Sequence, residues 1–135
     1  MQRCFSEGGK NIAMKVPPHQ YEQTVRFYRD LLGMEQISGP TGEAVGFKFG
    51  SNNLWIDKVP GMSQAELWLE ILTDDTTEAA KVLAAAGIVR CDEIEDLGKD
   101  LDGFWISNPA AIIHLVDAKD GSWAGGPQGN GRPQT

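Results

Sequence analysis

The same order of strand and helix patterns occurs twice along this chain. Residues 11–58 contain an alternating apolar strand, a helix that ends at a Gly corner and a set of short strands, and the same order recurs in residues 66–118. The two copies start 55 positions apart, and their Gly corners, Gly33 and Gly87, lie 54 positions apart. Because one half-barrel unit cannot close a core alone, the copies are expected to bury their open faces against each other or against a partner.

Composition and charge exclude several classes of function. The 135 residues suit one domain, and 41% hydrophobic with 23% charged residues is typical of a soluble globular protein. A net charge of -7 argues against nucleic acid and suits either a cationic ligand or solubility alone. Cys4 and Cys91 match no metal or redox spacing, residues 1–9 lack the apolar core of a signal peptide, and no apolar run approaches a membrane span. We therefore expect a cytoplasmic protein with no membrane partner.

Local patterns place the elements and divide the chain. Residues 11–16 and 66–71 alternate as strands, and helical spacing predicts helices over residues 19–32 and from the N-cap Asp75 to the Gly87 corner. Shorter strands are expected near residues 34–38, 45–49, 54–57, 88–93, 103–106 and 112–116. This predicts an N-terminal extension (1–9), one domain (10–118, with repeats 11–58 and 66–118) and a Gly/Pro-rich flexible tail (119–135).

Two segments resemble the signature patterns of a known superfamily. Residues 16–18 (VPP) and 27–34 (FYRDLLGM) resemble the opening V-x-D … F-Y-x-x-x-L-G-F of the vicinal oxygen chelate superfamily, which includes glyoxalase I, bleomycin-resistance and extradiol-dioxygenase proteins. Residues 104–115 (FWISNPAAIIHL) are similar to its closing F-x-D-P-D-G-x-x-x-E-L, in a form that is one residue shorter. The resemblance implies an α+β, glyoxalase-like fold, in which paired βαβββ units form curved mixed sheets around a cavity with helices outside. Many members are homodimers.

The resemblance also implies which strand positions face the cavity. If the helices lie outside the sheet, the apolar stripe of each strand packs on them and the alternate positions face inward. This nominates the following residues: Asn11, Ala13, Lys15, Trp55, Asp57, Glu66, Trp68, Glu70, Ile112 and His114. Of these, Asn11, Asp57, Glu66 and His114 match the metal-binding positions of the family's metalloenzymes. One imidazole, two carboxylates and an amide suit a divalent metal, although the second His of dioxygenase-like members is missing.

Plainer interpretations stand beside these assignments. Asp57, Glu66 and His114 also suit a hydrogen-bonded cluster in a metal-free cavity, and Lys15 with Glu70 suits a cross-strand ion pair. Trp55, Trp68 and Trp105 would either wall a ligand pocket, together with Ile112, or form ordinary core.

Three functions follow from these alternatives. The first is a metal-dependent lyase or isomerase on a vicinal-oxygen substrate, with Glu66 transferring a proton and Lys15 holding an anionic group. The second is a metal-free protein that sequesters a cationic aromatic drug or metabolite, with the acidic groups of Asp57, Glu66 and Glu70 and the Trp rings as its ligand-binding side chains. The third is a non-catalytic regulatory or scaffold module. A homodimer is expected, because inward Trp residues and apolar sheet edges need cover.

Overall fold

The computed structural model describes residues 6–39, 42–97 and 102–119, and the predicted tail lies almost wholly outside these ranges. The elements in chain order are β1 (Ser6–Gly8), β2 (Asn11–Val16), α1 (Pro18–Arg26), a π-helical turn (Phe27–Leu31), β3 (Gln36–Ser38), β4 (Val45–Phe49), β5 (Asn52–Lys58), β6 (Glu66–Thr73), α2 (Thr76–Ala85), β7 (Val89–Arg90), a 3-10 turn (Asp92–Ile94), β8 (Gly103–Ser107) and β9 (Ile113–Ala118). No helix of the described residues is both long and apolar enough to cross a membrane.

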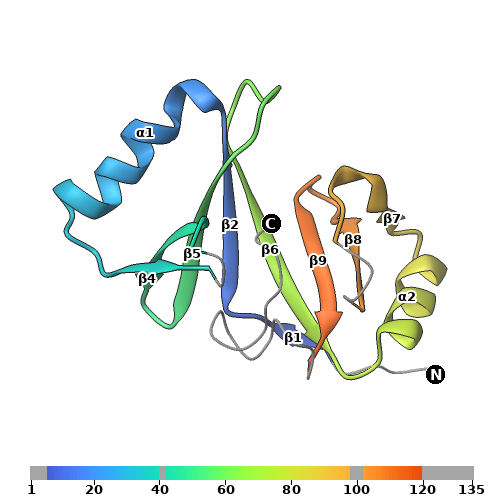
Figure 1. The fold of residues 1–135 in the computed structure, drawn as a ribbon. Coiled ribbons are helices and arrows are strands. Elements are labelled where there is room, and N and C mark those ends of the chain that lie inside the picture. The colour runs from blue at the N-terminus through green and yellow to red at the C-terminus, as the bar shows by residue number, and fades with distance from the viewer. Residues whose placement is uncertain (1–5, 40–41, 98–101, 120–135) are drawn as a thin grey trace.

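The strands form one mixed sheet that is symmetric about its centre. Their order is β3-β4-β5-β2-β6-β9-β8-β7, so each predicted repeat contributes four consecutive strands (Figure 1). Within each repeat the outer pairs are antiparallel and the inner pair, β2 with β5 or β6 with β9, is parallel. The two halves join where β2 runs antiparallel to β6, with Ala13 opposite Trp68. The two βαβββ units predicted from the repeat are therefore confirmed.

Each helix covers the outer face of its own half of the sheet. The stripe of α1 contributes Val25 to a buried cluster with Val16 and Phe47, and Ala79 of α2 packs with Phe104 and Val116. The helix ends follow the sequence signals. The carboxylate of Asp75 accepts a hydrogen bond from the backbone N–H of Glu78 at 3.0 Å, as expected of an N-cap. Gly33 and Gly87 adopt positive φ angles of 66° and 81° at the two corners.

Two segments differ from the sequence predictions. Within the predicted extension of residues 1–9, Ser6–Gly8 form β1, which pairs antiparallel with the end of β6. The strand expected near residues 88–93 is only two residues long. It stops because the Asp92 carboxylate turns to accept the backbone N–H of Trp105, at 3.0 Å, and a 3-10 turn follows.

Candidate functional site: an acidic cavity beside a buried lysine

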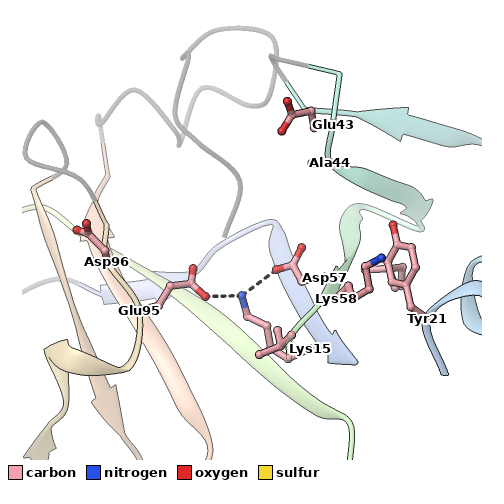
Figure 2. A pocket seen from close by; sticks show the side chains of 10 residues that line it. Lys15, Tyr21, Glu43, Ala44, Asp57, Lys58, Glu95 and Asp96 are labelled. Carbon is pink, nitrogen blue, oxygen red and sulfur yellow. Dashed lines mark hydrogen bonds and ion pairs between the residues drawn. The ribbon is translucent and has the colours of Figure 1, made fainter. Parts of the chain in front are cut away.

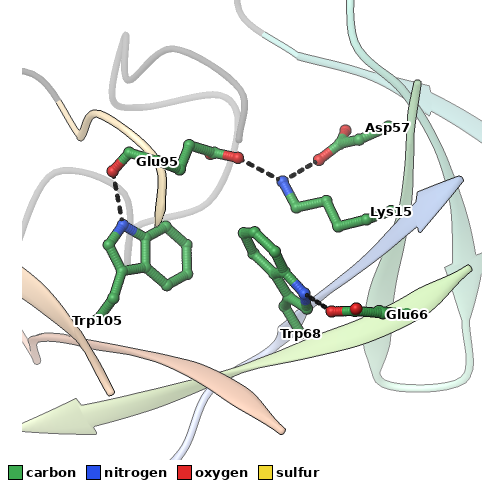
Figure 3. Close-up of polar contacts among 6 residues, drawn as sticks. All are labelled: Lys15, Asp57, Glu66, Trp68, Glu95 and Trp105. Atoms are coloured by element: carbon green, nitrogen blue, oxygen red, sulfur yellow. Dashed lines mark hydrogen bonds and ion pairs between the residues drawn. The ribbon is translucent and has the colours of Figure 1, made fainter. Parts of the chain in front are cut away.

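A lysine lies at the centre of the inner face, between the two repeats. Strand pairing sets Lys15 of β2 directly between Asp57 of β5 and Glu66 of β6. The Lys15 side chain is 0% exposed, and its Nζ lies 2.8 Å from Asp57 Oδ2 and 2.9 Å from Glu95 Oε1 (Figure 3). Glu95 belongs to the loop after the 3-10 turn, so the lysine joins a strand of the first repeat to a loop of the second. An ammonium group without water needs such partners.

Two tryptophans enclose the other side of this lysine. The Lys15 ammonium lies 4.4 Å from the centroid of the Trp68 ring, a cation–π distance. Trp105 meets Trp68 edge to face, with ring centroids 5.3 Å apart, and its indole N–H donates to the Glu95 carbonyl at 2.9 Å. Trp68 donates its own indole N–H to Glu66 Oε1 at 2.9 Å (Figure 3). The rings therefore hold both Lys15 and the Glu95 loop in place.

The Asp57 carboxylate is perturbed by its surroundings. Burial raises its pKa from 3.8 to about 6, and this effect exceeds the opposing attraction of Lys15. The Glu95 carboxylate adds a smaller increase. Asp57 therefore changes its charge near neutral pH, and a carboxyl group with such a pKa beside a cavity is characteristic of a functional site.

A cavity of about 460 Å³ opens above the Lys15–Asp57 pair. Figure 2 shows its side chains, which come from the ends of β2 and β5, from α1, and from the loops before β4 and after the 3-10 turn. Its lining residues are Lys15, Tyr21, Glu43, Ala44, Ile56, Asp57, Lys58, Val59, Glu95 and Asp96. The charged groups among these described residues are four carboxylates and two ammonium groups. The Lys58 ammonium lies 5.2 Å from the Tyr21 ring centroid.

Asn11 and Glu70 form a separate polar cluster at the opposite end of β2. The side-chain amide of Asn11 donates to Glu70 Oε1 at 3.3 Å, and its carbonyl oxygen accepts the Trp55 indole N–H at 2.8 Å. Asn53 also donates to that oxygen, at 3.2 Å. The predicted cross-strand pair of Lys15 with Glu70 is therefore wrong, because Glu70 bonds Asn11 whereas Lys15 bonds Asp57 and Glu95.

The prediction that His114 faces the cavity is wrong. His114 pairs with Ile106 of β8, which packs on the α2 side of the sheet, whereas the neighbouring Leu115 packs on the inner face with Trp68 and Trp105. Because successive side chains of a strand point to opposite faces, the predicted inward position was wrong by one residue. Ile112 likewise lies outside the cavity, exposed in the turn before β9.

The turn before β9 explains the shift. Ala111 adopts a φ of 66°, which is the backbone conformation suited to the Gly of the family's D-P-D-G motif. Asn108 closes the turn by accepting the backbone N–H groups of Ala110 and Ile112 at 2.8 and 2.9 Å. The turn therefore has its full length, and counting onward places Leu115, not His114, at the position of the motif's Glu.

The four predicted metal ligands consequently do not converge. Asn11 bonds Glu70 at one end of the inner face, Lys15 separates Asp57 from Glu66 in the strand register, and His114 is on the opposite face. Within residues 6–39, 42–97 and 102–119, no three His, Cys, Asp or Glu side chains are grouped so that they could hold a metal ion. A divalent cation next to the Lys15 ammonium would also be repelled. The described residues do not fit the metal that the sequence resemblance implies.

The aromatic wall is also different from the one expected. Trp55, Trp68 and Trp105 are buried in the protein core, and none of them lines the cavity. Gly46 leaves the space into which the Trp55 ring packs. The side chains that do line the cavity and were not predicted include Tyr21, Glu43, Glu95 and Asp96. The acidic run of residues 92–96 was the one visible signal for the last two.

Comparison with solved structures identifies the fold. Neither a family model nor a curated protein matches the chain. The Mn(II)-bound glyoxalase from Novosphingobium aromaticivorans superposes with a TM-score of 0.61 and 12% identity, covering 98% of this chain and 43% of that one. The 2,3-dioxygenase LapB from Pseudomonas sp. KL28 gives 0.52 and 17%, covering 96% and 44%. Homoprotocatechuate 2,3-dioxygenase from Brevibacterium fuscum gives 0.50 and 17%, covering 86% and 36%.

These three proteins share the architecture but not the length. The chain spans less than half the length of each of them. Sequence identities this low are evidence for a shared fold and not for a shared activity. The symmetric sheet of two βαβββ units, the opening motif and these superpositions agree with one another. The protein has a glyoxalase-like fold.

Proposed function

We propose that the protein binds a small molecule with a cationic group in the cavity above Asp57, and that it does so without a metal. The observation that carries this proposal is the charge arrangement. Among the described residues that line the cavity, four of the six charged side chains are carboxylates, and one of the two ammonium groups, Lys15, is fully buried between Asp57 and Glu95. The volume of about 460 Å³ lies in the range of small-molecule sites.

Asp57 is the residue proposed to contact the ligand. Only one of its carboxylate oxygens, Oδ2, bonds Lys15, and the other points away from the lysine (Figure 2). Lys15 cannot easily hold an anionic group of the ligand, since both of its ion-pair partners would have to yield. The ammonium instead keeps Asp57 in one orientation, which lowers the entropy cost of binding a cation there. Tyr21 and Ile56 supply apolar surface for the rest of the ligand.

A screen of matched fragments tests this proposal. Protein purified and kept in EDTA would be mixed with 2-phenylethylamine and, separately, with the anionic 3-phenylpropionate, and binding followed by ligand-observed NMR at pH 7.5. We expect the amine to bind at least about tenfold more tightly, the difference expected when a charge meets an opposite rather than a like charge at close range. Asp57→Asn should weaken amine binding, whereas Glu93→Gln, an exposed carboxylate outside the cavity lining, should not. Preference for the anion, or binding that EDTA abolishes, would overturn the proposal.

A proton-transfer enzyme is the second candidate, and the Asp57 carboxyl group supports it. A pKa of about 6 is close to neutral pH, where a carboxylate both accepts and returns a proton. A bound ligand with an acidic C–H bond next to Asp57 would then exchange hydrogen with solvent. Incorporation of deuterium from D₂O into a ligand, lost in Asp57→Asn, would favour the enzyme over the binding protein.

A further inference from the structure

The two ammonium groups among the described lining residues of the cavity are held very differently. Lys15 is fully buried against Trp68 and bonds two carboxylates. Lys58 is exposed, and its ammonium lies 5.2 Å from the centroid of the Tyr21 ring. No carboxylate of a described residue lies within ion-pair distance of that ammonium. A cation over a solvent-exposed ring is a weak contact, so Lys58 can leave the ring whereas Lys15 is fixed.

The path of β5 explains why Lys58 reaches the tyrosine. Lys58 is the last residue of this strand, and alternation places it on the same face as Ile56, which packs beneath α1. Tyr21 belongs to α1, packs on the same buried cluster and also lines the cavity. Figure 2 shows the Lys58 and Tyr21 side chains together at one end of the cavity. The ammonium therefore lies on the part of the ring that a ligand would otherwise contact.

Tyr21 is also close enough to Asp57 for one ligand to contact both residues. Burial raises the pKa of the Tyr21 phenol, and the charge of the Asp57 carboxylate raises it further. The two side chains thus interact electrostatically across a partly dehydrated cavity of about 460 Å³. A ligand whose ammonium bonds Asp57 has the Tyr21 ring as the wall for its apolar part.

We propose that Lys58 determines the specificity of this cavity, because its ammonium covers the Tyr21 ring and is displaced by ligands whose apolar part contacts that ring. This inference rests on the proposed function. An amine with little apolar surface cannot replace Lys58 on the ring and keeps only its contact with Asp57. An aromatic amine gains both contacts, so the cavity selects for it.

Removing the Lys58 ammonium should tighten the binding of an aromatic amine. Lys58→Met keeps the length of the side chain and should lower the Kd of 2-phenylethylamine about three- to tenfold in ligand-observed NMR at pH 7.5, because the ligand then displaces no cation and meets no like charge. The matched control is Lys48→Met, which removes an exposed lysine of β4 outside the cavity lining and should change the Kd by less than about twofold. An unchanged or higher Kd in Lys58→Met, or an equal gain in Lys48→Met, would overturn the inference.

A ring variant separates displacement from a simple effect of charge. In a Tyr21→Leu background there is no ring for Lys58 to cover, so adding Lys58→Met should lower the Kd by less than about twofold. A gain as large as the one in the wild-type background would show that Lys58 acts through its charge alone, and the inference would be wrong. Circular dichroism checks that each variant is folded.

The NMR signal of Lys58 reports on the same contact independently of ligand affinity. Because an aromatic ring shields protons above its face, the ε-CH₂ protons of Lys58 should resonate upfield of their position in Tyr21→Leu. Saturating 2-phenylethylamine should return them towards that position. Equal positions in both proteins, or no response to an amine that binds, would overturn the inference and leave the proposed function standing. An amine that binds neither the wild type nor Lys58→Met would overturn the proposed function and the inference together.

Discussion

Replacing Asp57 by Asn should make the protein more stable at neutral pH. The carboxylate is only 12% exposed, and burial raises its pKa from 3.8 to about 6 even though Lys15 is bonded to it. The folded state therefore binds this proton more tightly than the unfolded chain does. The stability that the protonated group contributes is complete below pH 3.8 and is lost as the pH rises through about 6.

The difference between these two pKa values fixes the magnitude. It corresponds to about 3 kcal/mol of unfolding free energy, which the wild type loses between acidic and neutral pH through this one group. An amide does not titrate, and its oxygen can still accept a hydrogen bond from Lys15, which also retains Glu95. The stability of Asp57→Asn relative to wild type should therefore rise by up to about 3 kcal/mol from pH 4 to pH 7.5.

Urea unfolding followed by Trp fluorescence measures this difference at each pH. Glu93→Gln is the matched control, because it removes an exposed carboxylate, and its difference from wild type should stay flat. A flat difference for Asp57→Asn as well, or one that falls as the pH rises, would refute the reasoning. A stabilised variant that has lost ligand binding would show that the carboxylate is kept for function at the expense of stability.

Other variants address the surroundings of the site. Lys15→Met should cost about 3–5 kcal/mol of unfolding free energy at pH 7.5, because two partly buried carboxylates lose their common partner; a loss below about 1 kcal/mol in urea unfolding would contradict this. Gly46→Ala should cost about 1–3 kcal/mol, since its Cβ would lie 2.5 Å from the Trp55 ring, whereas Gly8→Ala, with nothing within 4 Å, is the control for thermal unfolding. His114→Ala should leave binding of 2-phenylethylamine unchanged within about twofold by NMR, because the imidazole is on the face away from the cavity. A large loss of amine binding would show that His114 does contribute to the site.

The fold could be predicted because its signals are local. The alternation in residues 11–16 and the Asp75 cap are each specified within a few neighbouring residues, and the repeat then fixes how the strands must combine. β1 was not predicted because a three-residue strand next to Gly9 has no apolar pattern. It forms because its backbone pairs with residues 71–73 of β6.

The site was only partly predictable because its contacts are not local. Asp57 and Lys15 were nominated by alternation alone, but Glu95 reaches Lys15 across 80 positions, from a loop whose sequence reads only as an acidic run. In β9 both faces are apolar, so the rule that apolar residues face the helices cannot choose between His114 and Leu115. The turn before β9 is one residue longer than the motif comparison indicated, and this difference places Leu115 rather than His114 on the inner face.

The ionisation of Asp57 tests the central claim, that this carboxylate recognises a cation in a metal-free cavity. The measurement is an NMR pH titration of the aspartate side-chain carbons in EDTA-treated protein, with the Asp57 signal assigned by its loss in Asp57→Asn. The free protein should show a pKa of about 6 for Asp57, and saturating 2-phenylethylamine should lower it, because a nearby cation favours the charged carboxylate. A pKa near 3.8, or one that the amine leaves unchanged, would contradict the claim.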